Sequence, residues 1–237
     1  MIPSTARTRR RPRPYNQAEQ AYSQVRDLLV AGKFQPGDRL HEMDLSVALS
    51  MSRTPIREAL RRLQSDGLVA PTGRGVVVAS LSAEDMRHAL EVQGALESLA
   101  AELAATRQRD GMLAPAEIHK LLAAATEVEE LSATGDVPGV WRANLRFHQL
   151  IAELGGNPLL VESLDRIWIK FAIVTLHNLR GRRRLTPPHT HHRVVLDAIV
   201  NGDPAGAAAA ARAHSREGTA HYLASLAEPQ IEPPVQP

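Results

Sequence analysis

Histidines in the second half of the chain are the side chains best suited to hold a metal ion. Asn144 and His148 are four residues apart, which puts them on one face of a helix. His192 opens a later predicted helix, and His214 lies inside the last one. Three imidazoles and an amide oxygen that converge in a helical bundle would form a divalent-metal site with open positions for water or a carboxylate. A single histidine on such a helix is more often a satisfied or half-exposed side chain, so both interpretations stand.

Other side chains around these histidines admit more than one role. His189 and His191 flank His192 and could replace it as the ligand. Trp141 and Trp168 fall on apolar stripes of their predicted helices, which is typical of a core residue or of the wall of a pocket.

A second group of side chains suits contact with nucleic acid. Arg53, Thr54 and Arg57 lie at the N-terminal end of a predicted helix, where a helix inserted in the major groove meets bases and phosphates. Arginine makes paired hydrogen bonds to guanine, whereas threonine and the helix N-terminal amides suit phosphate oxygens. Arg61 and Arg62 lie farther along the helix and are expected to contact the DNA backbone. Glu58 is expected to orient Arg57 or to cap the helix locally.

Three predicted helices must position these arginines. Helical spacing begins at Ala18 and ends before Gly32, and a second short helix is expected from about Glu42 to Leu49. Thr54, followed by a proline, is the predicted N-cap of the third helix, and Gly67 is placed to end it.

A β-hairpin is expected directly after the third helix. Its two β-prone runs cover residues 68–70 and 76–79, and its basic tip carries Arg74 and Gly75. Three short helices followed by a hairpin is the order of a winged helix-turn-helix, whose third helix enters the major groove.

The rest of the chain is predicted to be all-helical. Ser82 and Asp85 form the pattern of a capping box and open a long helix. Further helices are expected at residues 115–133, 137–154, 158–179, 188–201 and 204–226. The fold class is therefore mainly α, with a small β-hairpin in the N-terminal part and a helical bundle in the C-terminal part.

The net charge changes sign between the predicted winged helix and the helical part that follows it. Residues 1–80 hold 13 Lys and Arg against 7 Asp and Glu, a net charge of +6, whereas the remainder holds 15 against 19, a net charge of −4. This asymmetry indicates that the first part meets a polyanion. We expect a basic disordered arm at 1–17, a DNA-binding domain at 18–79, a sensor domain at 80–227 and a loose tail at 228–237.

The composition narrows the possible chemistry. The chain has no cysteine, which excludes disulfides, thiolate zinc sites and cysteine nucleophiles. No apolar run approaches the ~20 residues that span a bilayer, and the Arg-rich N-terminus lacks the apolar segment of a secretory signal. We expect a cytoplasmic protein without a membrane partner.

The first part of the chain closely resembles the DNA-binding domain of the GntR family of bacterial regulators. The resemblance covers about residues 18–79, and its most specific part is the stretch PGDRLHEMDLSVALSMSRTPIREALRRLQSDGLVAPTGRGVVV. It implies that Arg53, Thr54 and Arg57 contact DNA, with Arg74 and Gly75 on the wing.

The second part is similar to the FCD ligand-binding domain of the FadR subfamily of that family. The resemblance is carried by Leu96-Glu97, Asn144-x-x-x-His148, His192-Arg193 and Ala211-x-x-His214. It implies a metal held by Asn144, His148, His192 and His214, with a small organic acid completing the coordination. The sequence departs from the family at Asn144, where the usual ligand is Asp, and at Gln93, where an Arg is common in the first helix.

These observations predict a homodimeric transcription regulator, a repressor rather than an enzyme, that binds operator DNA. Its effector is expected to be a small carboxylate bound at a divalent ion (zinc, nickel or manganese), with Gln93 and Trp141 in the effector site. Two alternatives are a metal-dependent hydrolytic enzyme and a regulator whose histidines bind the effector without metal.

Overall fold

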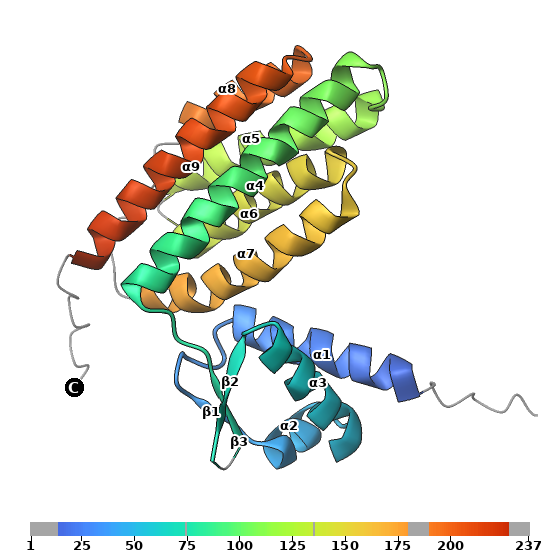
Figure 1. Ribbon diagram of the computed structural model, residues 1–237, viewed down its shortest axis with the longest axis vertical. Coiled ribbons are helices and arrows are strands. Elements are labelled where there is room, and N and C mark those ends of the chain that lie inside the picture. Colours follow the sequence, from blue (N-terminus) through green and yellow to red (C-terminus); the bar gives the residue numbers. More distant parts are fainter. Residues whose placement is uncertain (1–13, 74, 135, 180–189, 228–237) are drawn as a thin grey trace, which may run out of the picture. The chain divides into compact units, whose positions relative to one another are not determined.

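Residues 14–73, 75–134, 136–179 and 190–227 are described by a computed structural model, in which the chain divides into two units between Ser80 and Leu81 (Figure 1). Residues 1–13 of the predicted arm, Arg74, His189 and the C-terminal tail lie outside the described residues, as does the side chain of His191. The last four residues of the arm predicted at 1–17 are not disordered but belong to the first helix, which begins at Pro14.

The first unit combines three helices with a small antiparallel sheet. Its elements are α1 (Pro14–Val30), β1 (Arg39–Leu40), α2 (Glu42–Ala48), α3 (Arg53–Ser65), β2 (Val69–Thr72) and β3 (Gly75–Val78). Apolar side chains from every helix and from the sheet are buried together, among them Val25, Leu29, Leu45, Ile56 and Val78. This core fixes α3 on α1 and α2 and leaves the opposite face of α3 exposed.

Capping residues predict one end of α3 correctly and the other end only approximately. Gly67 ends the helix as predicted: it has a φ of 70°, and the amide of Leu68 donates to the carbonyl of Leu63 at 2.9 Å. The predicted N-cap, however, is wrong, because the cap is Ser52 rather than Thr54. A proline fits anywhere in the first helical turn, where amides have no partner within the helix, so it locates the start only to within that turn.

The sheet has a third strand that the sequence did not indicate. β2 pairs with β3 in the expected hairpin, with Val69 opposite Val78, but β1 pairs with the other edge of β3 through Arg39 and Leu40. The predicted two-stranded hairpin is thus corrected to a sheet in the order β1-β3-β2. A strand of two residues is too short to show an alternating pattern.

The second unit contains helices only, among the residues that the structure describes. They are α4 (Ala83–Arg109), α5 (Pro115–Thr134), α6 (Val137–Leu154), α7 (Pro158–Leu179), α8 (Thr190–Val200) and α9 (Pro204–Ala227). The capping box of Ser82 and Asp85 is present, and the Ser82 hydroxyl accepts from the Asp85 amide at 3.0 Å. The mainly α fold class is confirmed.

Helix α4 lies at the centre of this unit and contacts α6, α7, α8 and α9 (Figure 1). Its pairing with α9 is close because small residues meet: a Cβ added at Gly94 would lie 2.4 Å from the Ser215 hydroxyl. The Ser98 hydroxyl donates to the carbonyl of Ala208 at 2.9 Å and bonds the same two helices. Larger side chains fill the rest of the core, including Phe147, Leu164 and Leu196.

No helix within the described ranges carries an apolar stretch long enough to cross a membrane.

Two leucines of α7 offer a matched test of this core. Leu164 is fully buried, whereas Leu159 is 72% exposed. Because Leu164→Ala leaves a cavity, we expect it to destabilise the second unit by about 2–5 kcal/mol, and Leu159→Ala to change stability little. Both tryptophans lie in this unit, so urea unfolding followed by tryptophan fluorescence reports on it selectively. Equal midpoints for the two variants would contradict the assigned core.

Candidate metal centre and nucleic-acid interface

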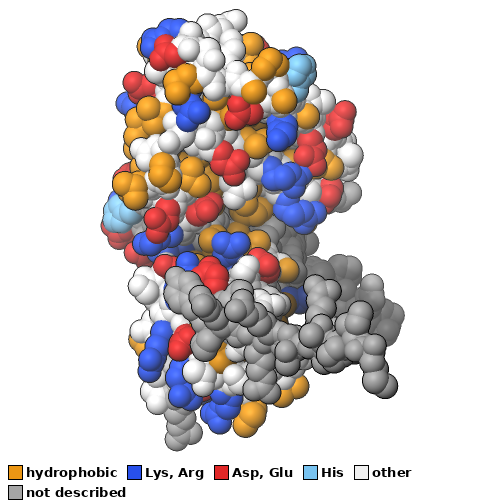
Figure 2. All heavy atoms as spheres, turned by 90° about the vertical axis from the view of Figure 1, so that its right-hand side faces the viewer, with side chains coloured by type: hydrophobic (Ala, Val, Ile, Leu, Met, Phe, Trp, Pro, Cys, Tyr) orange, Lys and Arg blue, Asp and Glu red, His pale blue; other side chains and the backbone are white. Residues whose placement is uncertain are grey.

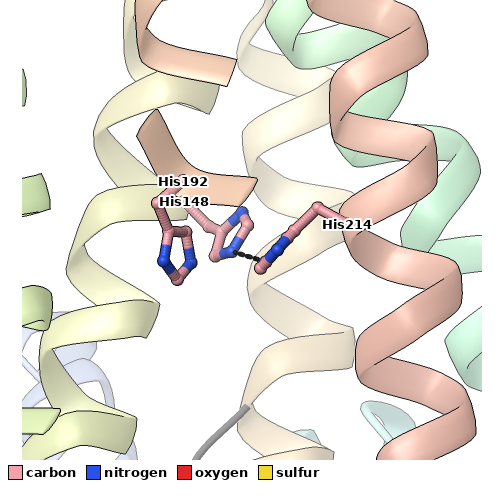
Figure 3. A group of neighbouring side chains, drawn as sticks. All are labelled: His148, His192 and His214. Carbon is pink, nitrogen blue, oxygen red and sulfur yellow. Dashed lines mark hydrogen bonds between the residues drawn. The ribbon is translucent and has the colours of Figure 1, made fainter. Parts of the chain in front are cut away.

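Three histidines from three helices converge inside the second unit. His148 comes from α6, His192 from α8 and His214 from α9, and their rings point toward one another (Figure 3). The Nε2 atoms of His148 and His214 are 3.2 Å apart, and one ring nitrogen from each histidine lies within 4.8 Å of the others. All three side chains are buried, with exposed fractions of 7%, 1% and 8%. The structure thus brings together the three histidines that the sequence singled out.

Contacts between rings hold the imidazoles in place. His148 stacks on His214 with ring centroids 5.1 Å apart, and the ring centroids of His192 and His214 are 4.4 Å apart. Phe147, which is fully buried, makes edge contacts to His148 and His192. This packing restricts ring rotation and keeps the ring nitrogens facing one another.

The spacing of His148 and His214 suits two ligands of one divalent metal ion, and a ring nitrogen of His192 lies within 4.8 Å of theirs. Two nitrogens that bind one ion at about 2.1 Å with bond angles of 90–109° are roughly 3.0–3.4 Å apart, and the observed 3.2 Å lies within that range. Burial lowers the pKa of His148 to about 4, so its imidazole is neutral at pH 7 and has a lone pair for a metal. Imidazole nitrogen suits zinc and nickel, and carboxylate or amide oxygen suits manganese.

A buried carboxylate, that of Glu97 on α4, lies beside the Nδ1 side of the His148 ring. Its Oε1 accepts hydrogen bonds from Gln93 Nε2 at 2.8 Å and from Trp168 Nε1 at 3.1 Å. The same oxygen is 3.6 Å from His148 Nδ1, the nitrogen that faces away from His214. Burial raises the pKa of Glu97, and His148 is neutral at pH 7, so the contact is not an ion pair at that pH. At 3.6 Å the contact is also too long for a hydrogen bond, and Nε2 is the nitrogen of His148 that faces His214.

Sequence reasoning noted Glu97 only as part of a motif and missed this role. The available signal was a lone carboxylate on a helix face otherwise made of small and apolar residues, since buried glutamates are rare without partners.

A cavity of about 170 Å³ adjoins the histidines. His148 and His214 line it, and so do the predicted residues Asn144, Gln93 and Trp141. Asn144 lies one turn before His148 on α6 and is half-buried, which is compatible with its predicted role as a fourth ligand. Trp168 lines the same cavity, as expected of a pocket wall.

The exposed face of α3 carries the predicted DNA contacts. Arg53, Thr54, Arg57 and Arg61 are all exposed along it. Gly75 opens β3, is exposed and has a φ of 133°, a conformation that side chains larger than hydrogen rarely adopt.

Glu42 of α2, rather than Glu58, orients Arg57. The guanidinium donates two hydrogen bonds to Glu42, from Nε to Oε1 and from Nη2 to Oε2, each 2.8 Å long. Arg53 Nη2 lies 3.6 Å from the same carboxylate. The hydrogen bond from Arg57 lowers the pKa of Glu42, so the carboxylate is charged at neutral pH. Sequence reasoning missed this residue because its partners are on another helix.

Farther along α3, Arg62 is engaged inside the unit. It pairs with Glu19 of α1 and lies 4.1 Å above the ring centroid of Tyr22. Tyr22 in turn donates to Asp66 at 2.8 Å, and burial together with this bond raises the pKa of Tyr22 to about 12. Arg62, which the sequence suggested as a DNA-backbone contact, is therefore engaged between α3 and α1 in the structure.

On the second unit, the surface visible in Figure 2 has no corresponding basic face. Lys and Arg side chains are mixed there with Asp and Glu, and hydrophobic side chains lie between them. Nucleic-acid binding needs a basic patch or stripe, which this view of the unit does not show.

Comparisons with known proteins agree with the division into two units. Residues 17–78 match the model for "Bacterial regulatory proteins, gntR family", and residues 88–217 match the "FCD domain" model. An "Uncharacterized HTH-type transcriptional regulator YdhC" of Bacillus subtilis (strain 168) is 28% identical over 92% of this chain and 95% of its own length. A "Putative L-lactate dehydrogenase operon regulatory protein" of Escherichia coli (strain K12) is 30% identical over 85% of this chain and 84% of its own. The solved structure of E. coli McbR/YncC has the same fold, with a TM-score of 0.76, 22% identity and coverage of 90% of this chain and 99% of its own.

Proposed function

We propose, starting from the fact that the chain belongs to the GntR family and carries an FCD domain, that it is a repressor released from its operator by a small carboxylate bound at a metal ion. That it is a DNA-binding transcription regulator, and not a hydrolytic enzyme, follows from the family itself. The observation that carries the proposal is the cluster of His148, His192 and His214, whose ring nitrogens lie within 4.8 Å of one another beside a cavity.

In the proposed DNA complex, α3 lies in the major groove of operator DNA. Arg53 and Arg57 at its N-terminal end would contact bases, and Thr54 and Arg61 would contact phosphates. Arg74 and Gly75, on the wing, would reach the minor groove or phosphates next to it. The pairing of Arg57 with Glu42 supports base reading, because a guanidinium fixed through Nε and one Nη2 hydrogen presents its remaining donors in a defined direction. This function places the protein in the cytoplasm.

The metal would be held by His148, His192, His214 and Asn144. When bound, it supplies positive charge and open coordination positions for an anion. Three neutral imidazoles and a neutral amide leave the full +2 charge of the ion, whereas an aspartate at position 144 would reduce it to +1. The chain's own set of ligands is therefore expected to hold metal less tightly and to attract a carboxylate more strongly. Gln93 and Trp141, which line the cavity, would contact the rest of the effector molecule.

The active form is proposed to be a homodimer. A single winged helix has a small contact area on DNA, whereas a two-fold pair reads a palindrome and gains affinity from its effective concentration. Helix α4 offers a surface for a second copy: Val92 and Leu99 are two turns apart on one face and are 52% and 39% exposed, with exposed Ala95 between them. Apolar side chains gathered in this way favour a protein contact.

Glu42 offers a test of DNA recognition. Glu42→Ala removes a negative charge and releases Arg57, so we expect affinity for random duplex DNA to rise about 2- to 5-fold while discrimination against it falls. The specific duplex is first selected from a random pool, and both affinities are measured by fluorescence anisotropy in the same salt.

Two further variants control this result. Glu58→Ala removes an equal charge from an exposed position of α3 and leaves the Arg57–Glu42 pair intact, so it should preserve discrimination. Arg57→Ala should weaken the selected duplex by about 10- to 100-fold and random DNA much less. If Arg57→Ala weakens both duplexes equally, the arginine contacts only phosphate.

Asn144 and His214 test the metal centre. Asn144→Asp should increase metal affinity and decrease carboxylate affinity, because the added charge acts on both in opposite directions. His214→Ala should lose metal together with the effector response. Metal content is measured by elemental analysis, and binding of metal by calorimetry.

His119→Ala, at an exposed histidine of α5, is the matched control and should keep metal. If His214→Ala retains full metal content, the proposed centre is wrong. A wild-type protein that responds to a carboxylate without any metal would support the alternative in which the histidines bind the effector directly.

Leu99→Glu tests the dimer. It places a charge on the apolar face of α4, so we expect the dimer to dissociate at micromolar concentration in sedimentation velocity. Leu159→Glu, which alters another exposed leucine on α7, should remain dimeric. A wild-type protein that sediments as a monomer, both free and on DNA, would contradict the dimer itself.

A further inference from the structure

Two residues that line the cavity each bury a polar atom without a hydrogen-bond partner among the described residues. These atoms are Oε1 of Gln93 and Nε2 of His221. Burying a polar atom unpaired is unfavourable, so a bound molecule that supplies the missing hydrogen bond gains affinity. The two atoms therefore indicate what kind of group the effector carries beside its carboxylate.

Hydrogen bonds to Glu97 show which end of the Gln93 amide is unpaired. Glu97 Oε1 accepts from Trp168 Nε1, an atom that can only donate, at 3.1 Å. The same oxygen accepts from Gln93 Nε2 at 2.8 Å. The amide nitrogen of Gln93 is thus engaged, and its oxygen remains as an acceptor that needs a donor.

Both unpaired atoms belong to residues on the same side of the histidine cluster. Ser98 bonds to Ala208 while Gly94 lies against Ser215, so α4 and α9 run antiparallel. Gln93 precedes Glu97 by one turn of α4, and His221 follows His214 by two turns of α9. At a rise of 1.5 Å per residue these offsets are about 6 and 10 Å along the two helices.

The stretch of α9 between His214 and His221 adds further polar lining. Ser215 and Thr219 line the cavity on this stretch, and their hydroxyls can both donate and accept. The polar lining is therefore not confined to the imidazoles at the metal centre.

A hydroxyl group suits these atoms better than a charged group does. It donates to an acceptor such as Gln93 Oε1, and it pairs with His221 Nε2 in either ring tautomer. A carboxylate has acceptors only and leaves Gln93 Oε1 unpaired, and the described residues of the lining include no lysine or arginine to balance its charge. An ammonium group has donors only and leaves a donating tautomer of His221 unpaired.

We propose that Gln93 and His221 form a second polar position of the effector cavity, and that this position binds hydroxyl groups of a hydroxylated carboxylic acid. The carboxylate of the effector lies at the histidine end, and its hydroxyls pair with Gln93 Oε1 and His221 Nε2. This inference rests on the proposed function, because the metal centre is the anchor of the carboxylate.

Calorimetry with matched acids tests this position on zinc-loaded full-length protein at pH 8, where an imidazole is ordinarily neutral. The probes are 4-hydroxybutyrate, 5-hydroxypentanoate and 6-hydroxyhexanoate, which carry the hydroxyl at increasing distances from the carboxylate. Each is compared with the unsubstituted acid, the dicarboxylate and the terminal amino acid of the same chain length. We expect at least one hydroxy acid to bind about 5- to 10-fold more tightly than all three of its counterparts, the gain from about one net hydrogen bond.

Three variants locate the source of this preference. Gln93→Met and His221→Phe each remove the unpaired atom and keep a side chain of similar size, and each should reduce the preference by at least about 3-fold. His119→Phe, at an exposed histidine of α5 outside the cavity, should keep it. Zinc content is measured on every variant, because Gln93 also donates to Glu97 beside the metal centre. A preference that survives in both cavity variants overturns the second polar position.

Zinc content and affinity for the selected duplex, measured on the same samples, separate the two proposals. Protein that binds DNA but takes up no zinc overturns the metal-anchored function. The acids are then titrated into this protein, where a hydroxyl preference that His221→Phe reduces still supports the second polar position. Protein that takes up zinc but prefers no hydroxy acid overturns the second polar position alone. Protein that shows neither zinc uptake nor a hydroxyl preference overturns both.

Discussion

Small residues on α4 and α9 let these helices approach closely, and the histidine cluster depends on that approach. Gly94 leaves room for the Ser215 hydroxyl, and Ser98 donates to a carbonyl of α9. The contact sets the height of His214 relative to Glu97, and Glu97 in turn faces His148. A larger side chain at position 94 would push α9 away and separate ring nitrogens that are now 3.2 Å apart.

Most of the fold could be predicted because helix ends carry chemical signals. Prolines at 115, 158 and 204 each stand at the start of a helix, and the capping box of Ser82 and Asp85 does the same for α4. Strand β1 could not be found, since two residues show no periodicity. The predicted start of α3 was two residues too late, because a proline in the first turn is compatible with more than one N-cap.

The candidate site was harder to predict than the helices that build it. His148, His192 and His214 stood out because a bundle interior needs a reason for an imidazole. Glu97 did not stand out, since its role depends on which helices are neighbours, whereas Trp141 and Trp168 were already predicted as core residues or pocket wall. Helix α9 is so rich in alanine that its sequence shows no distinct buried face. Glu42 escaped notice for the same reason, because its partner Arg57 belongs to another helix.

Ion pairs with α1 and with α2 hold different portions of α3. Arg62 joins it to α1 through Glu19 and Tyr22, whereas Arg57 is aimed by a carboxylate from α2. The unit that can be exchanged between regulators is therefore larger than the recognition helix. A grafted α3 would arrive without the carboxylate that aims its arginine, so new DNA specificities are expected to arise through paired changes in α2 and α3.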